Sequence, residues 1–530
     1  MPKKLTIDGK NITARDDATI IQAAYEAGIT IPHYCYHPKL SIAGNCRMCL
    51  VELEGRPKLE ISCNTPVADD MVVFTNSDRV VEGRRGVLEF LLINHPLDCP
   101  ICDQAGECGL QDYYMQYGLN KSRFQEEKVH KSKVVDFGPD IVFDGERCIL
   151  CTRCVRFTQE ITHTHELGIF NRGDTVEIAT FPGKQLDNPY AGNVVDVCPV
   201  GALTSRDFRF KIRVWFLKEA KSICPGCARG CNINVHYNQD RVYRLKPRQN
   251  DAVNELWICD AGRYGYKSIN DQRVLYPMVR QGDGLERTDW QTALAQASNA
   301  LQQHAGAGVG IIVAPQGTNE DLYLLSKLAN HVSTAAQVRL YTGEPGDEDE
   351  FLIRADKNPN TRGAEAIGLP APATAEAIAA LAQAIEQGSI KVLYAIDTDL
   401  AAAFGADAVG RLAAQLDCLI VQTSNERPGW QQAHVVLPSA VYAERDGTFT
   451  NFEGRVQRLN PAFAPRGEAL PAWQIYQRLG QALGESDDYA SAEAVLMELA
   501  TAVPAFSGMS YAKVGDLGQM LLHDETEQTH

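Results

Sequence analysis

Cysteine spacing is the feature that most constrains the fold of this chain. Fifteen of its sixteen cysteines fall into four groups between residues 35 and 259, and only Cys418 lies outside them. Two or three cysteines of each group are separated by two to five residues, a spacing typical of metal ligands. Disulfides are the alternative, and they suit small exported domains. The opening residues MPKK are not followed by the apolar segment of a secretory signal, so we expect reduced thiols.

Each group supplies the ligands of one iron–sulfur cluster, provided that His95 joins the second group. The predicted ligands are Cys35, Cys46, Cys49 and Cys63 (set 1), His95, Cys99, Cys102 and Cys108 (set 2), Cys148, Cys151, Cys154 and Cys198 (set 3), and Cys224, Cys227, Cys231 and Cys259 (set 4). A row of clusters without other evident chemistry predicts a protein that transfers electrons.

The residues before set 1 predict a small ferredoxin-type domain. Two short β-rich runs flank the turn dipeptide Asp8-Gly9, which indicates a hairpin. The segment DDATIIQAAYEAGI has apolar residues at helical spacing. We expect Asp16 or Asp17 to cap this helix and Gly28 to end it.

Set 1 itself has the spacing C-x10-C-x2-C-x13-C. Plant-type ferredoxins share its x2 pair and its distant fourth cysteine, although their first gap is shorter. The small residues Ala43-Gly44-Asn45 would let the backbone approach a cluster closely. We therefore predict a [2Fe–2S] cluster, with a four-cysteine zinc site as the alternative.

Set 2 combines a histidine with three cysteines, in the spacing H-x3-C-x2-C-x5-C. Residues 84–94 have a helical period, and Pro96 should end that helix just after His95. No fourth cysteine is free to complete the set, so we predict that His95 ligates a [4Fe–4S] cluster. A neutral imidazole would change the charge of that cluster. We interpret His33 and His37 as non-ligands.

Set 3 begins with C-x2-C-x2-C, the run of bacterial ferredoxins. Only one such run occurs here, so Cys198, in a Cys-Pro pair, is the natural fourth ligand of a [4Fe–4S] cluster. Three arginines lie close in sequence to the run: Arg147, Arg153 and Arg156. They are expected to screen an anionic cluster, although a solvated basic face would have the same sequence.

Set 4 has the spacing C-x2-C-x3-C-x27-C. Short alternating strands, NINVHY and RVYRLKP, lie between its third and fourth cysteines. We predict a small β-rich cap that holds one [4Fe–4S] cluster. The alternative is that the four cysteines bind a zinc ion.

The distal half predicts a different architecture. Amphipathic helices such as DWQTALAQASNALQQH alternate with buried strands such as VGIIVAP, KVLYAID and DCLIVQT, which indicates a doubly wound α/β sheet. The glycines of residues 306–310 precede a strand, so they do not form a dinucleotide-binding turn. Cys418 lies inside an apolar strand and is expected to be a core residue.

Net charge and hydropathy limit the kinds of partner that this chain can bind. The formal net charge of −16 argues against nucleic-acid binding, which needs a basic surface. No apolar stretch approaches the roughly 18–20 residues of a membrane helix, so we expect contact with a membrane only through other proteins.

Taken together, these motifs resemble the large iron–sulfur (75 kDa-type) G subunit family of NADH-quinone oxidoreductase, respiratory complex I. The order HYCYH, GNCRMC, NHPLDCPICDQAGECGLQ, ERCILCTRCVRF and DVCPVGAL is that of the family, and CPGCARGC resembles the additional cluster of some bacterial members. The resemblance implies a peripheral subunit on the cytoplasmic side of the bacterial inner membrane. Its partners would be the NADH/FMN-binding flavoprotein subunit, the 2Fe-2S subunit of E type, the 4Fe-4S subunit of I type and the quinone-site subunits.

The distal half resembles a reduced molybdopterin-oxidoreductase fold. Its late signature comprises Glu444, Gly447, Thr448, Asn451, Glu453, Gly454 and Arg455, which we interpret as retained scaffold. No cysteine occurs between 260 and 417 to bind molybdenum or tungsten, and residues 344–376 have the character of a loop that replaces a larger domain. We therefore expect one 2Fe-2S cluster, three 4Fe-4S clusters and no molybdopterin.

The expected fold class is multidomain α+β and α/β. Its parts are a β-grasp 2Fe-2S ferredoxin domain (1–80), a 4Fe-4S segment with one histidine and three cysteines (81–120), a ferredoxin-like 4Fe-4S domain (121–217), a β-rich 4Fe-4S cap (218–275), a reduced molybdopterin-oxidoreductase-like α/β domain (276–485) and a C-terminal helix and tail (486–530).

Three other functions compete with that of an electron-transfer subunit. An NAD-dependent formate dehydrogenase can share the four-cluster front end, but it needs molybdenum or tungsten. A diaphorase or iron-only hydrogenase shares the first three clusters, and the hydrogenase needs cysteines beyond the one left over. A zinc-binding scaffold is the fourth possibility. No stand-alone substrate site is expected in this chain, and no catalytic residue is assigned.

Overall fold

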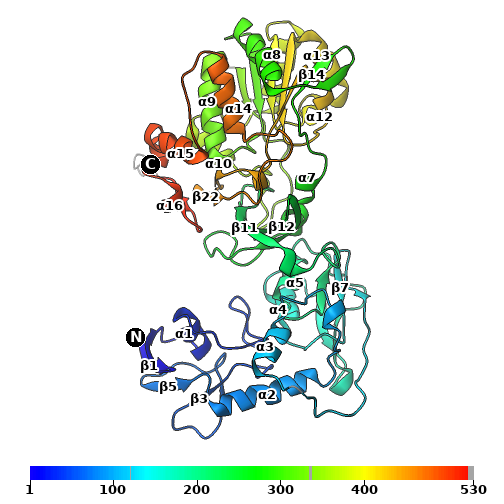
Figure 1. The fold of residues 1–530 in the computed structure, drawn as a ribbon, viewed down its shortest axis with the longest axis vertical. Coiled ribbons are helices and arrows are strands. Elements are labelled where there is room, and N and C mark those ends of the chain that lie inside the picture. The colour runs from blue at the N-terminus through cyan, green and yellow to red at the C-terminus, as the bar shows by residue number, and fades with distance from the viewer. Residues whose placement is uncertain (120, 334–336, 523–530) are drawn as a thin grey trace. The chain divides into compact units, whose positions relative to one another are not determined.

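The computed structural model describes residues 1–119, 121–333 and 337–522. The chain divides into two compact units, Met1–Leu217 (unit 1) and Lys218–His530 (unit 2), which Figure 1 shows in blue to cyan and in green to red. The predicted C-terminal tail, residues 523–530, lies outside the described residues. Among the helices of the described ranges, none combines the length and the apolar character needed to cross a membrane.

Unit 1 starts with a five-stranded mixed sheet in the order β2-β1-β5-β3-β4. The strands are β1 (Lys3–Ile7), β2 (Lys10–Ala14), β3 (Leu50–Leu53), β4 (Glu60–Ile61) and β5 (Met71–Phe74). The predicted hairpin joins β1 and β2, and its turn residues Asp8 and Gly9 have φ angles of 49° and 81°. Apolar residues of this sheet and of helix α1 (Ile20–Glu26) form a common core that also includes Cys49 and Cys63.

Helix α1 shows where the sequence prediction was wrong about a cap. The exposed Asp16 and Asp17 precede the helix, and the capping residue is Thr19, whose backbone N–H donates to Oε1 of Gln22 at 2.8 Å. A capping box satisfies two N-terminal N–H groups, which a carboxylate three residues earlier in the chain cannot reach. Gly28 follows the helix with a φ of 74°, so the predicted stop is confirmed.

The rest of unit 1 consists of short elements around the thiols. They are α2 (Asp78–Leu92), α3 (Gly109–Tyr117), β6 (Val135–Asp136), β7 (Ile141–Phe143), α4 (Arg153–Glu160), β8 (Leu167–Phe170), β9 (Glu177–Thr180), α5 (Asn193–Val197) and β10 (Leu203–Ser205). Helix α2 begins six residues before the predicted start, because Ser77 caps it by accepting from the N–H of Val80.

Unit 2 begins with a three-stranded antiparallel sheet, β11 (Lys218–Ile223), β12 (Asn232–Asn238) and β13 (Arg241–Pro247). The last two strands match the predicted runs NINVHY and RVYRLKP. The short helices α6 (Asp260–Tyr264) and α7 (Lys267–Asn270) follow. We call these residues, 218–271, the cap.

The core of unit 2 is a seven-stranded sheet in the order β15-β14-β20-β19-β18-β16-β17. Its strands are β14 (Met278–Gln281), β15 (Gly284–Arg287), β16 (Val309–Val313), β17 (Val338–Leu340), β18 (Val392–Ile396), β19 (Cys418–Thr423) and β20 (Val435–Pro438). The five strands from β20 to β17 are parallel, and the β14–β15 hairpin adds an antiparallel edge.

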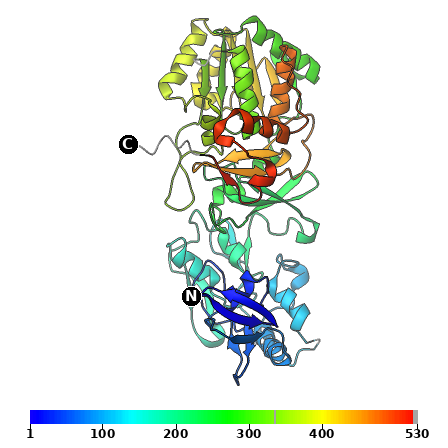
Figure 2. The ribbon, with the colours of Figure 1, turned by 90° about the vertical axis from the view of Figure 1, so that its left-hand side faces the viewer.

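Helices cover both faces of this sheet (Figure 2), and alternate residues of one strand enter two different cores. Ile311 and Val313 pack with α8 (Trp290–Gln303), α9 (Asn319–Val332), α14 (Ala472–Ala482) and α15 (Ala492–Ala502). Ile312 packs with α11 (Ala375–Glu386), α12 (Leu400–Phe404) and α13 (Ala406–Gln415). Burial on both faces explains the continuous apolar runs of these strands.

Residues 344–376 contain more structure than the predicted loop. Helix α10 (Thr361–Ile367) lies inside this range, with the carbonyl of Asn360 accepting from the N–H of Ala364. The hairpin β21 (Gly447–Thr450) and β22 (Arg455–Leu459), the strand β23 (Gln519–Met520) and the helix α16 (Tyr511–Val514) complete unit 2.

Candidate metal centres

The four thiols of set 1 are linked in pairs inside unit 1. Cys35 hydrogen-bonds to the thiols of Cys46 and Cys63, which holds the pKa of Cys35 well below its usual range. Cys63 also hydrogen-bonds to Cys49, and this interaction lowers the pKa of Cys49. The backbone N–H of Cys35 donates to Sγ of Cys46 at 3.4 Å. A φ of 62° at Gly44 lets the loop curl around the sulfurs, as the small residues of this segment predict.

The three cysteines of set 2 interact electrostatically with one another across a tight loop. Cys99 begins a single 3₁₀ turn, Cys99–Ile101, and Cys108 caps the start of α3. Burial raises the pKa of Cys102 and of Cys108, whereas Cys99 is exposed. Backbone N–H groups face the two buried sulfurs and partly offset this effect, as they would for thiolate ligands.

His95 meets the chemical requirements of the fourth ligand. Its Nδ1 atom is buried and has no hydrogen-bond partner among the described residues. Burial lowers the pKa of His95 to about 4, so the ring is neutral and has a free lone pair. Asp98 and Arg147 influence both His95 and Cys102, which places these two residues in one corner of unit 1. His33 and His37 differ, because the Nδ1 of each contacts a nearby backbone group.

Set 3 forms a cradle. One small cavity is lined by all four of its cysteines, together with apolar side chains such as Phe143 and Ile178. Burial raises the pKa of Cys148 and of Cys198 to about 12, so unligated thiols would be neutral here. Leu150 and Thr152 take φ angles of 53° and 62° between the cysteines, a strained conformation that directs successive sulfurs into one cavity.

Buried arginines join set 3 to set 1. Nη2 of Arg156 donates to the carbonyl oxygens of Cys35, at 2.6 Å, and of Cys151, at 3.2 Å. Arg153 donates to the carbonyls of Tyr36 and Val197, which adjoin ligands of the same two sets. The side chain of Arg156 is buried, so the alternative of a solvated basic face is wrong for it.

Backbone contacts join set 3 to set 2. The N–H of Gly109, next to Cys108, donates to the carbonyl oxygen of Pro199, next to Cys198, at 3.0 Å. A Cβ atom on Gly201 would lie 2.3 Å from Sγ of Cys102, so only glycine fits at that position. Arg147 is also buried and pairs with Asp98 at 2.6 Å beside Cys99, so a solvated face is excluded for this arginine too.

Sequence reasoning missed Tyr34, which lies between sets 1 and 2. This residue is fully buried, and its hydroxyl points to the carbonyl of Gly109 at 3.5 Å. Burial raises the pKa of Tyr34, and the thiols of Cys108 and Cys46 contribute to the shift. Its position immediately before Cys35 was the only signal in the sequence, and adjacency alone does not indicate contact with a second set.

Set 4 lies in the cap of unit 2. Cys224 and Cys231 are joined by a backbone hydrogen bond of 2.8 Å, and Cys259 accepts from the N–H of Gly262 at 3.3 Å. A Cβ on Gly262 would approach Sγ of Cys224 to 3.1 Å. Burial raises the pKa of Cys224, Cys231 and Cys259, and all four thiols of the set interact electrostatically.

The donor chemistry of all four sets fits iron–sulfur clusters. Cradled thiols, N–H groups directed at sulfur and one unpartnered imidazole are the features that cluster ligation requires. In the residues that the structure describes, no three His, Cys, Asp or Glu side chains converge as the ligands of a single metal ion.

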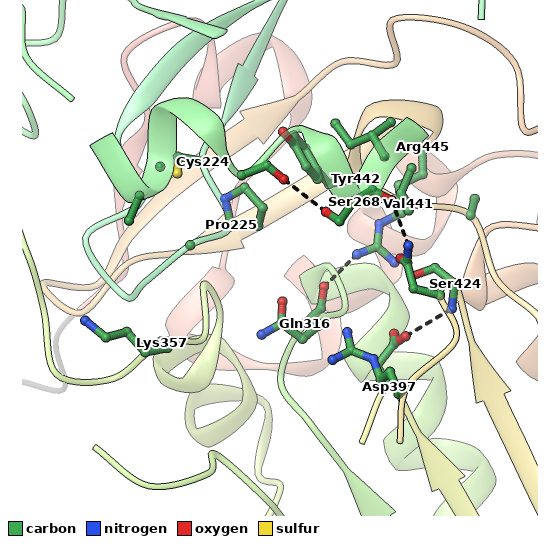
Figure 3. A pocket seen from close by; sticks show the side chains of 18 residues that line it. Cys224, Pro225, Ser268, Gln316, Lys357, Asp397, Ser424, Val441, Tyr442 and Arg445 are labelled. Atoms are coloured by element: carbon green, nitrogen blue, oxygen red, sulfur yellow. Dashed lines mark hydrogen bonds between the residues drawn. The ribbon is translucent and has the colours of Figure 1, made fainter. Parts of the chain in front are cut away.

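A second feature of unit 2 is a polar cavity of about 290 Å³ beside Cys224 (Figure 3). It opens at the carboxyl ends of the parallel strands, where Gln316, Asp397 and Ser424 follow β16, β18 and β19. Cys418 does not reach it: this residue is the first of β19, 3% exposed and packed in the apolar core.

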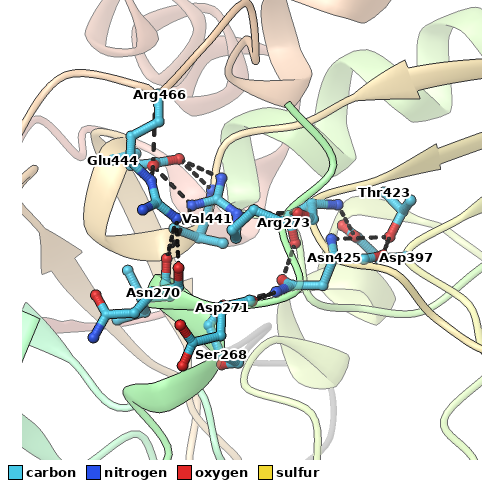
Figure 4. A network of polar contacts seen from close by, with 12 residues as sticks. Ser268, Asn270, Asp271, Arg273, Asp397, Thr423, Asn425, Val441, Glu444 and Arg466 are labelled. Atoms are coloured by element: carbon cyan, nitrogen blue, oxygen red, sulfur yellow. Dashed lines mark hydrogen bonds and ion pairs between the residues drawn. The ribbon is translucent and has the colours of Figure 1, made fainter. Parts of the chain in front are cut away.

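Three residues of the late signature, Glu444, Gly447 and Thr448, make packing and polar contacts in this part of unit 2. Glu444 forms a two-pronged ion pair with Arg273, at 2.8 and 2.7 Å, and its carboxylate also accepts from the N–H of Val441 (Figure 4). A Cβ on Gly447 would lie 2.6 Å from Thr318, and Thr448 donates its N–H to Glu320 at 2.9 Å. These contacts give the residues structural roles.

Five family models match consecutive parts of the chain. They describe a 2Fe-2S iron-sulfur cluster binding domain (2–78), the NADH-ubiquinone oxidoreductase-G iron-sulfur binding region (84–123), the ferredoxin-like domain of NADH-quinone oxidoreductase subunit 3 (138–204), the molybdopterin oxidoreductase Fe4S4 domain (217–271) and molybdopterin oxidoreductase (273–344 and 358–482). The predicted order of modules, from a 2Fe-2S domain to a molybdopterin-oxidoreductase domain, is therefore confirmed.

Curated relatives agree with these models. The chain is 46% identical over 336 residues to the mitochondrial NADH-ubiquinone oxidoreductase 78 kDa subunit of Neurospora crassa, covering 62% of this chain and 45% of the relative. It is 42% identical over 325 residues to the G subunit of the NADH-quinone oxidoreductase of Rickettsia conorii, covering 61% and 48%. The NADH-ubiquinone oxidoreductase 75 kDa subunit of Reclinomonas americana is 42% identical over 361 residues, covering 66% and 52%. The chain thus spans about half the length of these relatives.

Proposed function

We propose that this chain belongs to the G subunit family of NADH-quinone oxidoreductase and that it relays electrons from an NADH-oxidising flavoprotein subunit toward quinone. Bound iron–sulfur clusters would supply the one-electron redox chemistry. The chain's own residues hold the ligands, exclude water from the sulfurs and balance their negative charge. On this proposal the chain acts in catalysis only as a subunit of the oxidoreductase, without a substrate site of its own.

The observation that carries the proposal is the junction at set 3. Arg156 bridges the carbonyls of Cys35 and Cys151, and Gly109 bonds to Pro199. These contacts place ligands of set 3 beside ligands of both other sets of unit 1, which supports a path that passes through set 3. Buried guanidinium groups beside the carbonyls of cluster ligands would stabilise the added negative charge of a reduced cluster.

Set 2 has the character of an exit to a partner. Cys99 is exposed, and Leu97 and Ile101 beside it are 80% and 64% exposed. Exposed apolar residues around a redox ligand favour docking of another protein. A partner bound to this surface would place its own redox centre close to set 2. The proposed partners are the flavoprotein subunit, the E-type and I-type iron–sulfur subunits and the quinone-site subunits. On this proposal the chain is peripheral, on the cytoplasmic side of a bacterial inner membrane.

The proposed cofactors are one 2Fe-2S cluster at set 1 and one 4Fe-4S cluster at each of sets 2, 3 and 4, without molybdopterin. Set 1 then belongs to a β-grasp domain (1–80), set 2 to a segment with one histidine and three cysteine ligands (81–120), set 3 to a ferredoxin-like domain (121–217) and set 4 to a β-rich domain (218–275) that includes the cap. A doubly wound domain (276–485) and a C-terminal helix follow.

The residues of unit 2 do not fit a molybdopterin cofactor. A cavity of about 290 Å³ is at the lower limit of small-molecule sites, which range from about 300 to 1,000 Å³, and two pterin dinucleotides need far more. Cys418, the one cysteine outside the sets, is packed in a strand. The formate dehydrogenase alternative therefore has no observation that favours it over electron transfer.

The function is tested by replacing Cys151 with alanine in the assembled complex. We expect the electron paramagnetic resonance signal of one 4Fe-4S cluster and the reduction of quinone by NADH to be lost together. Reduction of ferricyanide by the flavoprotein should survive, because it does not pass through set 3. Cys418→Ala is the matched control and should leave both activities unchanged. Quinone reduction at the normal rate in Cys151→Ala would refute the proposed path.

A further inference from the structure

The cavity of unit 2 lies where open α/β sheets bind ligands. The carboxyl ends of parallel strands form its floor, and the wall facing them comes from Cys224, Gly226 and Gly262 of the cap. The electron-transfer proposal gives this space no role. Its volume of about 290 Å³ suits a molecule of mononucleotide size or smaller.

Three hydrogen-bond donors that line the cavity lack partners. The hydroxyl of Tyr442, a residue only 8% exposed, is buried without a hydrogen bond, and so are the Nε atoms of Arg427 and Arg445; this holds for contacts within the described ranges. An unsatisfied buried polar group costs about 1–3 kcal/mol, so it indicates a missing partner. All three groups can donate a hydrogen bond, so the site favours a ligand with several hydrogen-bond acceptors.

The turn that carries Tyr442 and the floor of the cavity are held by polar contacts. Tyr442 belongs to the single turn Tyr442–Glu444, and Glu444 is anchored by Arg273. Asn425 donates to the carbonyls of Ser268, at 2.7 Å, and of Asp271, which joins the floor of the cavity to the cap (Figure 4). These two parts of the site are therefore in place without a ligand.

The charges around the cavity favour an anion. Lys357, Arg427 and Arg445 line it, against the single carboxylate of Asp397 (Figure 3). Arg445 pairs with Asp321 at 3.1 Å, and Lys357 donates to the carbonyls of Asp347 and Arg354. Arg427 forms no ion pair in the described part of the chain, so its guanidinium remains available for a ligand.

We propose that this cavity binds a small oxyanion, as inorganic phosphate or as the phosphoryl group of a metabolite no larger than a mononucleotide. Guanidinium groups match the geometry of phosphate oxygens, and the hydroxyl of Tyr442 adds a neutral donor on the side of set 4. The site is independent of the electron path through unit 1, so it can exist whether or not that path is correct.

The experiment is isothermal titration of the full chain, purified anaerobically in phosphate-free buffer of constant ionic strength. Inorganic phosphate and adenosine monophosphate are the probes. We expect saturable binding at one site per chain, and a Kd weakened about tenfold or more in Arg427→Gln, which loses a charge-assisted hydrogen bond. Tyr442→Phe should weaken binding by a smaller factor, because it loses a neutral donor.

Arg411→Gln is the matched control, because Arg411 is exposed and does not line the cavity. It should bind both probes as the wild type does. Tighter binding of adenosine monophosphate would identify a phosphorylated metabolite as the source of the oxyanion, and equal or weaker binding would identify free phosphate. Absence of saturable binding, or equal affinity in the wild type, Arg427→Gln and Tyr442→Phe, would overturn the proposal.

Discussion

Units 1 and 2 use their cysteines in contrasting ways. In unit 1 the thiols are part of the core: Cys49 and Cys63 pack with the apolar residues of the first sheet, and set 3 is enclosed by Phe143 and Ile178. In unit 2 the two largest apolar cores lie on the faces of the seven-stranded sheet, and set 4 is confined to the cap. The predicted ligands of unit 1 therefore contribute to its apolar packing, whereas the cores on the sheet of unit 2 contain none of them.

The difference also concerns how sites are connected. Arg153 and Arg156 bind backbone carbonyls of two different sets, so one side chain helps to fix the position of both sites. In the polar network of unit 2, Arg273 and Arg466 bind both Glu444 and the carbonyl of Ile269 in the cap. This network stabilises a cavity and connects no second set. On the proposed function, unit 1 serves as the relay, and unit 2 is a scaffold that carries the one further set of ligands in its cap.

The largest expected effect compares Cys198→Ala with Cys259→Ala. Cys198 is buried in the centre of unit 1, and its loss should destabilise that unit by more than about 3 kcal/mol, since metal binding and folding are coupled. Cys259 is partly exposed in the cap, so its loss should leave the sheet of unit 2 intact. Hydrogen exchange measured by mass spectrometry reports each unit separately. If each variant lost protection from hydrogen exchange equally in units 1 and 2, the proposed difference between the two units would be wrong.

A second prediction concerns the bridge between sets 1 and 3. Arg156→Met should destabilise unit 1 by about 2–4 kcal/mol, because buried carbonyls of Cys35 and Cys151 lose a charged donor. The measurement is anaerobic urea unfolding, followed by the loss of cluster absorbance. Arg206→Met is the control, since Arg206 is exposed and pairs with the exposed Asp136. Identical unfolding of the two variants would show that the bridge contributes nothing.

The third prediction sharpens the account of unit 2. Burial raises the pKa of Glu320 from 4.5 to about 7, so folding favours its neutral form. The contribution of Glu320 to the free energy of unfolding is complete below pH 4.5, and about 3 kcal/mol of it is lost as the pH rises from 4.5 through 7. Glu320→Gln, which is neutral at every pH, should abolish this slope. Thermal unfolding of the wild type and of Glu320→Gln between pH 5 and 8 measures this pH dependence. The same dependence of stability on pH in both proteins would contradict a raised pKa of Glu320.

Sequence reasoning succeeded where the determinants are local. The Asp8-Gly9 turn predicted its hairpin, and apolar periodicity located the buried strands of unit 2. The ligand sets indicated by the cysteine spacing stay a prediction. Sequence reasoning failed where the outcome depends on competition or on distant residues. Thr19 outcompetes Asp16 as a cap because Gln22, three residues later, completes a capping box, a local signal that the sequence prediction did not use. The contact of Arg156 with Cys35 spans 121 residues, and no local pattern encodes it.

The central claim, that this chain holds a relay of iron–sulfur clusters and no catalytic metal, is tested most directly by elemental analysis. The anaerobically purified chain should contain about 14 iron atoms, the sum for one 2Fe-2S and three 4Fe-4S clusters, without molybdenum, tungsten or zinc. Iron accompanied by about one molybdenum or tungsten per chain would make unit 2 an active site and would contradict the claim.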